Sequence, residues 1–252
     1  MLKIPYRVLS VLSVLVLPVV FQVGCGIDVE GTFNEGMMLA QQGDYAGAAD
    51  KYELVIKYKP DHLGATLGLA AACFQQGNFD RSIELYKRAL EMDPENPRIH
   101  QSLAWVYIHT EKYDEAEKHL SRAVELDPQY YRAYVDLAWV RMSRKEYGEV
   151  LKAADRAIAL DNTAVEPYYF KGVAALMLDE LETAAEAFER AVELAPEQPS
   201  LYLYYAEVMQ KEQKVAEAIE SYRKFLELSN VDASERKKVE QRISQLEEQL
   251  KK

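Results

Sequence analysis

A repeat of 34 residues runs through most of this chain and constrains its fold more than any other feature. A proline or an asparagine recurs at that spacing at Pro60, Pro94, Pro128, Asn162, Pro196 and Asn230. Six windows therefore follow one another without insertion or deletion, at residues 29–62, 63–96, 97–130, 131–164, 165–198 and 199–232. Self-similarity at this period is typical of a stacked array, because one unit cannot bury its apolar face alone.

Other positions of the window keep the same register. The eighth position is always small: Gly36, Ala70, Ala104, Ala138, Gly172 and Ala206. The seventeenth is always large and apolar: Tyr45, Phe79, Tyr113, Tyr147, Leu181 and Val215. A small residue lets two helices approach closely, and a large residue beside it fills the remaining space. The proline or asparagine lies where one helix must stop before the next unit begins.

This pattern resembles the tetratricopeptide repeat, in which each unit is a pair of antiparallel helices. The resemblance covers residues 29–232, about 81% of the chain. It implies an all-α fold, a right-handed superhelical solenoid of six helix pairs. Three residues depart from the family pattern: Arg141 at an apolar eleventh position, Val150 at the small twentieth position, and Phe225 in place of alanine at the twenty-seventh.

The segment after the last repeat, residues 233–252, predicts one more helix. Val239, Ile243, Leu246 and Leu250 follow one another at spacings of four, three and four, which places them on one face. This helix either covers the apolar face of the last repeat or pairs with a partner helix. We favour the capping helix, because two heptads are marginal for a free coiled coil.

The first residues form a targeting segment rather than part of the array. Lys3 and Arg7 are the only charged side chains before Cys25. Val8–Val23 is 16 residues long and contains 12 apolar residues. It is shorter than the roughly 20 residues that a membrane-spanning helix prefers.

A basic start, an apolar stretch and small residues before a cysteine resemble the signal peptide of a bacterial lipoprotein. The resemblance implies a signal peptide over residues 1–24, a lipidated Cys25 and a short tether over residues 25–28. It also implies anchoring at the periplasmic face of the outer membrane, since Gly26 rather than aspartate follows the cysteine. Gln22 stands where an aliphatic residue is usual, so an uncleaved single-pass anchor and ordinary secretion remain alternatives.

The tetratricopeptide resemblance implies a concave groove lined by the second, fifth, ninth, twelfth and thirteenth positions of each repeat. Trp105 and Trp139, the only tryptophans, fall at the ninth position of adjacent repeats. The predicted peptide-binding residues are Phe33, Met37, Leu67, Phe74, Arg98, Trp105, Ile108, His109, Arg132, Val135, Trp139, Met142, Tyr169 and Val173. Tryptophan, tyrosine and methionine are enriched where binding energy concentrates. The alternative is that some of these side chains, Ile108 and Leu176 above all, belong to the core.

Several classes of function are disfavoured. With 41 acidic and 30 basic residues the net charge is −11, so the surface repels nucleic acid. The two cysteines and four histidines show no spacing typical of a metal site. No catalytic triad, phosphate loop or dinucleotide fingerprint occurs, so we expect no enzyme, cofactor or small-molecule substrate. Phe33 and Met37 replace the polar residues of the clamp by which some family members hold a chain-terminal carboxylate.

The whole chain resembles bacterial lipoproteins that join a lipid anchor to a tetratricopeptide array, including pilotin-like factors, pilus-assembly lipoproteins and adaptors for cell-wall enzymes. The resemblance implies a non-catalytic scaffold that binds a protein or peptide segment and supports assembly or secretion of an envelope complex. A self-associating structural array and an adaptor for cell-wall enzymes are the alternatives. The sequence names no partner and does not separate a role in pilus assembly from one in the cell wall.

Overall fold

The computed structural model describes residues 27–251, and this part of the chain contains thirteen α-helices and no strand. The all-α solenoid predicted from the repeat is confirmed. The helices are α1 Val29–Gln41, α2 Tyr45–Tyr58, α3 Leu63–Gln75, α4 Phe79–Met92, α5 Pro97–His109, α6 Tyr113–Leu126, α7 Tyr131–Ser143, α8 Tyr147–Leu160, α9 Val165–Met177, α10 Leu181–Leu194, α11 Pro199–Lys211, α12 Val215–Leu228 and α13 Ala233–Leu250. The predicted signal peptide and Cys25 lie outside the described residues.

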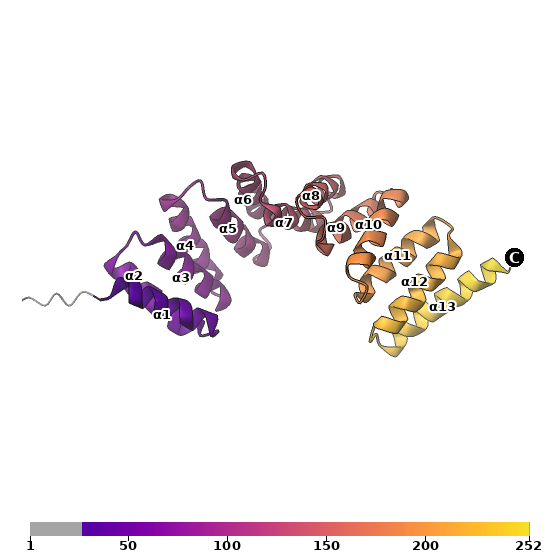
Figure 1. The fold of residues 1–252 in the computed structure, drawn as a ribbon, viewed down its shortest axis with the longest axis horizontal. Helices are drawn as coiled ribbons and strands as arrows, with labels where there is room; N and C mark the ends of the chain where they lie inside the picture. Colours follow the sequence, from indigo (N-terminus) through magenta and orange to yellow (C-terminus); the bar gives the residue numbers. More distant parts are fainter. Residues whose placement is uncertain (1–26, 252) are drawn as a thin grey trace, which may run out of the picture.

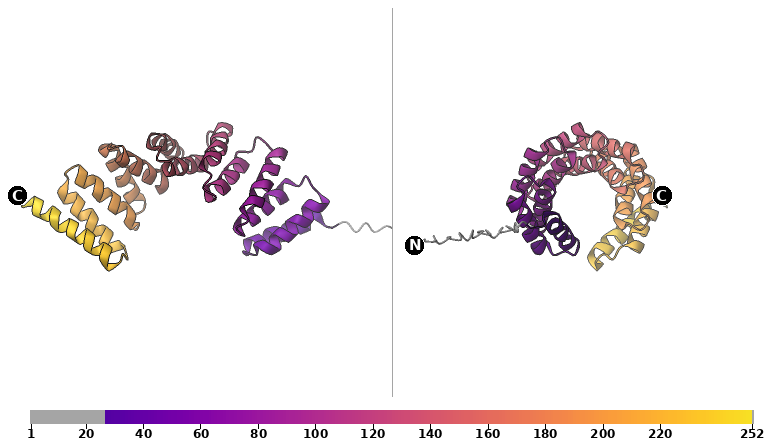
Figure 2. Two further views of the ribbon diagram at one scale, coloured as in Figure 1. Left: turned by 180° about the vertical axis from the view of Figure 1, so that it is seen from behind. Right: turned by 60° about the vertical axis from the view of Figure 1, so that its left-hand side comes forward.

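Each 34-residue window holds one odd-numbered helix of 13 residues and one even-numbered helix of 14 residues. Each helix packs against the next one along the chain, and the array curves into an arc (Figure 1). Viewed along another direction, the arc closes into most of a ring (Figure 2). Neighbouring odd-numbered helices contact one another, as α7 and α9 do. The odd-numbered helices therefore line the concave side.

The turn inside each pair has the same backbone conformation. The residue at the fifteenth position has a positive φ in all six repeats: Gly43, Gly77, Glu111, Lys145, Asp179 and Gln213. In the first repeat the amide of Asp44 donates to the carbonyl of Leu39 at 2.9 Å, which closes the end of α1. This is the left-handed C-cap that glycine favours. Four of the six turns adopt it without glycine.

The core forms where the small positions of the two helices meet. Ala104 and Ala116, at the eighth and twentieth positions of the third repeat, are both fully buried. In the second repeat the Ser82 hydroxyl donates to the carbonyl of Ala70 at 2.8 Å, so the helices touch closely enough for a side chain to reach the opposite backbone. Val150 is also fully buried, so this position accepts a larger side chain.

Arg141 departs from the pattern and is accommodated by ion pairs. Its Nε donates to Glu117 at 2.9 Å, and its guanidinium lies 3.8 Å from the Glu149 carboxylate. The Arg144 guanidinium contacts Glu117 as well. The charge at the eleventh position therefore joins α6, α7 and α8, where other repeats place an apolar side chain.

Helix α13 covers the last repeat, as predicted. Val239, Ile243 and Leu246 are buried against it, whereas Leu250, the last residue of the predicted stripe and of α13, is 58% exposed. Asp232 caps the helix by accepting hydrogen bonds from the amides of Ser234 and Glu235. The outer face of α13 is polar, which favours capping over pairing with another helix.

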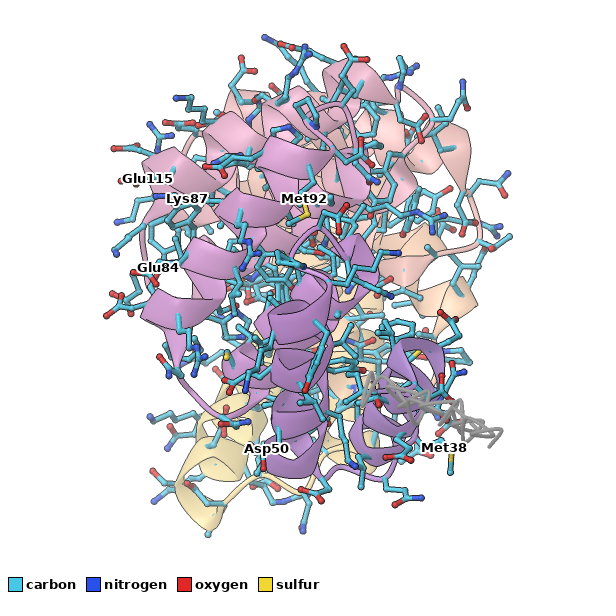
Figure 3. All side chains as sticks on the ribbon, turned by 90° about the vertical axis from the view of Figure 1, so that its left-hand side faces the viewer. Met38, Asp50, Glu84, Lys87, Met92 and Glu115 are labelled. Carbon is cyan, nitrogen blue, oxygen red and sulfur yellow. The ribbon has the colours of Figure 1, made fainter. Side chains whose placement is uncertain are left out.

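Figure 3 views the array from its N-terminal end, where Met38 is labelled. Met38, at the tenth position of the first repeat, is 58% exposed, whereas the equivalent Val106 and Val140 are buried. Charged side chains such as Glu84 and Lys87 occupy the outer surface of the even-numbered helices. The convex side is therefore a solvated surface.

Candidate functional site

The two tryptophans lie on the concave helices and remain accessible. Trp105 on α5 is 37% exposed and Trp139 on α7 is 38% exposed. Met37 on α1 is exposed to a similar extent. Six further predicted groove residues are partly buried: Phe33, Leu67, Phe74, Met142, Tyr169 and Val173. Large indole rings held at the surface by a rigid scaffold are suited to binding an apolar side chain.

Two predicted groove residues belong to the interior instead. Ile108 is 5% exposed and Val135 is 6% exposed. Helix α7 contacts both α5 and α9, and that packing removes both side chains from the surface. Leu176, the other residue for which a core position was the alternative, is also buried. The apolar strip is therefore interrupted between the tryptophans.

Trp105 is held by an aromatic cluster that joins two repeats. His109 lies 4.8 Å from the Trp105 ring and 4.8 Å from the Phe74 ring, edge-on to both. The His109 Nδ1 donates to the Trp105 carbonyl at 3.0 Å, since a carbonyl can only accept. Phe74 also packs on Phe79. This packing fixes the indole before any ligand arrives, which reduces the entropy lost on binding.

A buried carboxylate lies beneath the groove surface, and sequence analysis did not single it out. Asp136 on α7 is 3% exposed and accepts a hydrogen bond from the Gln101 amide at 2.6 Å. The Arg132 guanidinium is 3.8 Å away. Burial raises the pKa of Asp136, while the Gln101 hydrogen bond and the Arg132 charge oppose that rise. The Arg132–Asp136 spacing of four residues on a helix was the signal available in the sequence.

A hollow opens in the groove between α3 and α5. It has two adjoining lobes of about 360 and 380 Å³, and both are lined by Ala71, Tyr86 and Ser102. Arg132 and Trp105 border the first lobe, and Arg98 borders the second. Ala71 occupies the ninth position, where the next two repeats carry tryptophan. The small side chain leaves the space that a larger one fills elsewhere.

A larger hollow, of about 770 Å³, lies at the other end of the array among α10, α11 and α12. Tyr202, Tyr205, Arg223 and Lys224 are among its lining residues. It carries none of the predicted site residues, and we assign the candidate site to the concave groove.

The fold joins two histidines that the sequence leaves 19 residues apart. The Nδ1 atoms of His100 and His119 lie 3.0 Å apart, and the His100 Nε2 is 3.2 Å from the Pro94 carbonyl. That Nε2 must donate to the carbonyl, so in the neutral pair the His100 Nδ1 accepts from His119. Burial lowers the pKa of both rings, that of His119 to about 4. Within residues 27–251 no third ligand joins them to form a metal site.

His62 also has a structural role. Its Nδ1 accepts a hydrogen bond from the Ala65 amide at 3.0 Å, which caps the start of α3. Its ring lies 4.8 Å from that of Phe33. The contact holds Phe33, a predicted groove residue, between the first two repeats.

Comparison with known families identifies the class of protein. One model of the tetratricopeptide repeat family matches residues 39–106, 74–129 and 111–176, and a second model of this family matches residues 171–233. The chain belongs to the tetratricopeptide repeat family. Proteins of this family are generally non-catalytic scaffolds that mediate protein–protein interaction. No curated protein shows significant sequence similarity to the chain.

Solved structures share the fold. MamA from Desulfovibrio magneticus RS-1 is 19% identical with a TM-score of 0.63, over 69% of this chain and 98% of that one. A tetratricopeptide repeat protein from Parabacteroides merdae is 16% identical with a TM-score of 0.68, over 81% of each chain. YrrB, described as having an unusual peptide-binding site, is 20% identical with a TM-score of 0.58, over 67% of this chain and 87% of that one.

The membrane anchor predicted at Cys25 lies outside the described residues. Among residues 27–251, no helix has the length and apolar character needed to cross a membrane.

Proposed function

We propose that this protein is a non-catalytic lipoprotein scaffold of the bacterial cell envelope, whose concave groove binds a segment of a protein partner. The pair of exposed tryptophans on adjacent repeats carries the proposal for the groove. Trp105 and Trp139 occupy equivalent positions on α5 and α7, and those helices contact each other. Two large rings in fixed positions on a concave wall provide anchor points for a peptide.

The anchor is supported by the sequence before the array. An apolar stretch and small residues precede Cys25, and only three residues separate it from α1. A tether of that length spans on the order of 10 Å. A partner at the same membrane would meet the groove at a raised effective concentration. We infer a role in assembly or secretion of an envelope complex, such as a pilus or secretion machinery.

Site-specific photo-crosslinking in the native host tests the groove. The crosslinker replaces Trp105 or Trp139, and a control replaces Glu84 on the solvated outer surface of α4. We expect one dominant envelope protein to be captured from both groove positions and not from the control. Equal capture from Glu84 would contradict the groove, and capture of a second copy of this chain would identify self-association instead.

The anchor needs a separate test. We expect Cys25→Ala to move the protein from the membrane fraction to the soluble periplasmic fraction and to abolish labelling by an alkyne fatty acid. Cys73→Ala is the matched control, because Cys73 is buried in the second repeat. Unchanged membrane association with Cys25→Ala would indicate a single-pass anchor rather than a lipid.

A further inference from the structure

The hollow between α3 and α5 differs from the rest of the concave wall in shape. Helices α1 and α3 contact each other, as do neighbouring odd-numbered helices from α5 through to α11, and any contact between α3 and α5 is weaker than these. Ala71, the small residue that α3 presents to both lobes, leaves this space open. Gly68 also lines the second lobe, but an added Cβ there would lie 2.6 Å from the Tyr52 ring on α2, so this position is restricted to glycine by the packing of α2 and α3.

The hollow also differs in charge from the protein as a whole. The chain carries a net charge of −11, yet Arg98 and Arg132 border the two lobes from adjacent repeats. Within residues 27–251 Arg98 forms no ion pair, and it is exposed. Arg132 is 54% exposed, and Asp136, the carboxylate with which it forms an ion pair, already accepts a hydrogen bond from Gln101. Arg98 and Arg132 therefore place two exposed positive side chains at the border of the hollow.

From this combination we infer that the groove selects an extended peptide with an apolar side chain flanked by two aspartate or glutamate side chains. The inference rests on the groove of the proposed function and names the chemistry of its partner. The apolar side chain enters the hollow over Ala71, beside Trp105, and the carboxylates meet Arg98 and Arg132. Guanidinium groups bind carboxylates through paired, charge-assisted hydrogen bonds.

The dimensions favour an extended segment over a helix. Each lobe measures less than 400 Å³, which suits single side chains rather than a helix of roughly 10–12 Å diameter. Packed helices are about 8–10 Å apart, and a strand rises about 3.3 Å per residue. Two acidic residues about three positions apart in an extended peptide are therefore separated by about the same distance as two packed helices, and can reach Arg98 on α5 and Arg132 on α7. No free chain terminus is required, unlike in the carboxylate clamp of other family members.

The chain's own N-terminal segment is a poorer occupant. The apolar residues 8–23 are preceded by Lys3 and Arg7 and contain no acidic side chain. Two cations would be brought toward Arg98 and Arg132, and no carboxylate would balance them. An acidic partner segment fits the charges of the hollow, and a second copy of this chain becomes an outcome of the test.

A peptide selection tests the inference without a known partner. The described array, residues 27–251, is immobilised and used to select from a library of random nonapeptides that are displayed internally, with no free C-terminus. We expect the enriched peptides to contain an apolar residue flanked by aspartate or glutamate. We expect the charge-reversed variant Arg98→Glu/Arg132→Glu to enrich lysine and arginine at the same positions. Arg122→Glu, at an exposed site on α6, is the matched control and should leave the selection unchanged.

The dissociation constant of one enriched acidic peptide then measures how much the two arginines contribute to binding. We expect the double reversal to weaken it at least tenfold and added salt to weaken it further, since exposed charges are screened. In one contrary outcome, the native array enriches neutral or basic peptides whose binding is still lost in Trp105→Ala. That result would overturn the acidic preference and leave the groove as the binding site. Failure to enrich any peptide, or equal enrichment after Trp105→Ala, would overturn the groove as well. Circular dichroism of each variant checks that the array remains folded.

Discussion

The close approach of the two helices in the fifth repeat makes a sharp prediction for Gly172. An added Cβ there would lie 2.7 Å from Cζ of Phe188 and 2.8 Å from two further ring atoms. Phe188 is fully buried, and its ring stacks on that of Tyr204 at a centroid distance of 5.6 Å. The ring therefore has no free space into which it can move. Gly172→Ala must shift a packed ring or separate α9 from α10.

Two opposing effects determine how far Gly172→Ala changes the free energy of unfolding. Overpacking a well-packed core costs typically about 1–3 kcal/mol. Replacing glycine by alanine inside a helix stabilises by about 1 kcal/mol. The net expectation is a free energy of unfolding lowered by about 1 kcal/mol. Gly148, near the start of α8, is the matched control, because nothing lies within 4 Å of an added Cβ. Gly148→Ala should therefore raise stability by about 0.5 kcal/mol.

Urea denaturation followed by circular dichroism measures both variants. Repeat arrays can depart from two-state unfolding, so the order of the midpoints is the primary result: Gly172→Ala below the native chain and Gly148→Ala above it. Phe188→Leu should relieve the clash, which makes the Gly172→Ala/Phe188→Leu pair less destabilised than the sum of the single changes. A Gly172→Ala chain as stable as Gly148→Ala would refute the close-contact reasoning.

Three further predictions concern other parts of the array. Leu246→Ala in α13 should lower the free energy of unfolding by about 2–4 kcal/mol, and Leu250→Ala by less than about 0.5 kcal/mol, because only Leu246 is buried. Equal losses of the two variants in urea titrations would contradict the capping role of α13. Lys145→Gly should raise the denaturation midpoint by relieving a φ of 60°, and Lys145→Val should lower it. Burial lowers the pKa of His119 to about 4, so between pH 7 and pH 5 the unfolded chain binds more protons than the folded chain, and the free energy of unfolding should fall as the pH drops. In His119→Phe this fall should be about 1–2 kcal/mol smaller. The same pH dependence in the variant and the native chain would refute the role of His119.

The sequence by itself determined the fold, because the repeat period acts through local rules. Residues that recur every 34 positions experience the same neighbours, so one helix pair defines all of them. The small eighth positions and the polar outer face of α13 required no knowledge of distant contacts. The placement of Trp105 and Trp139 on the concave helices followed from the same register.

Details that depend on the spacing between neighbouring repeats were decided only by the tertiary structure. Ile108 and Val135 share groove positions with the partly accessible Met142 and Tyr169, yet helix packing buries them. His100 and His119 become hydrogen-bond partners because α5 and α6 pack together. The hollow over Ala71 exists because α3 and α5 make a weak contact. A repeat pattern fixes which face a side chain occupies, but the side chains across each interface decide how far the helices stand apart, and therefore what remains accessible to a partner.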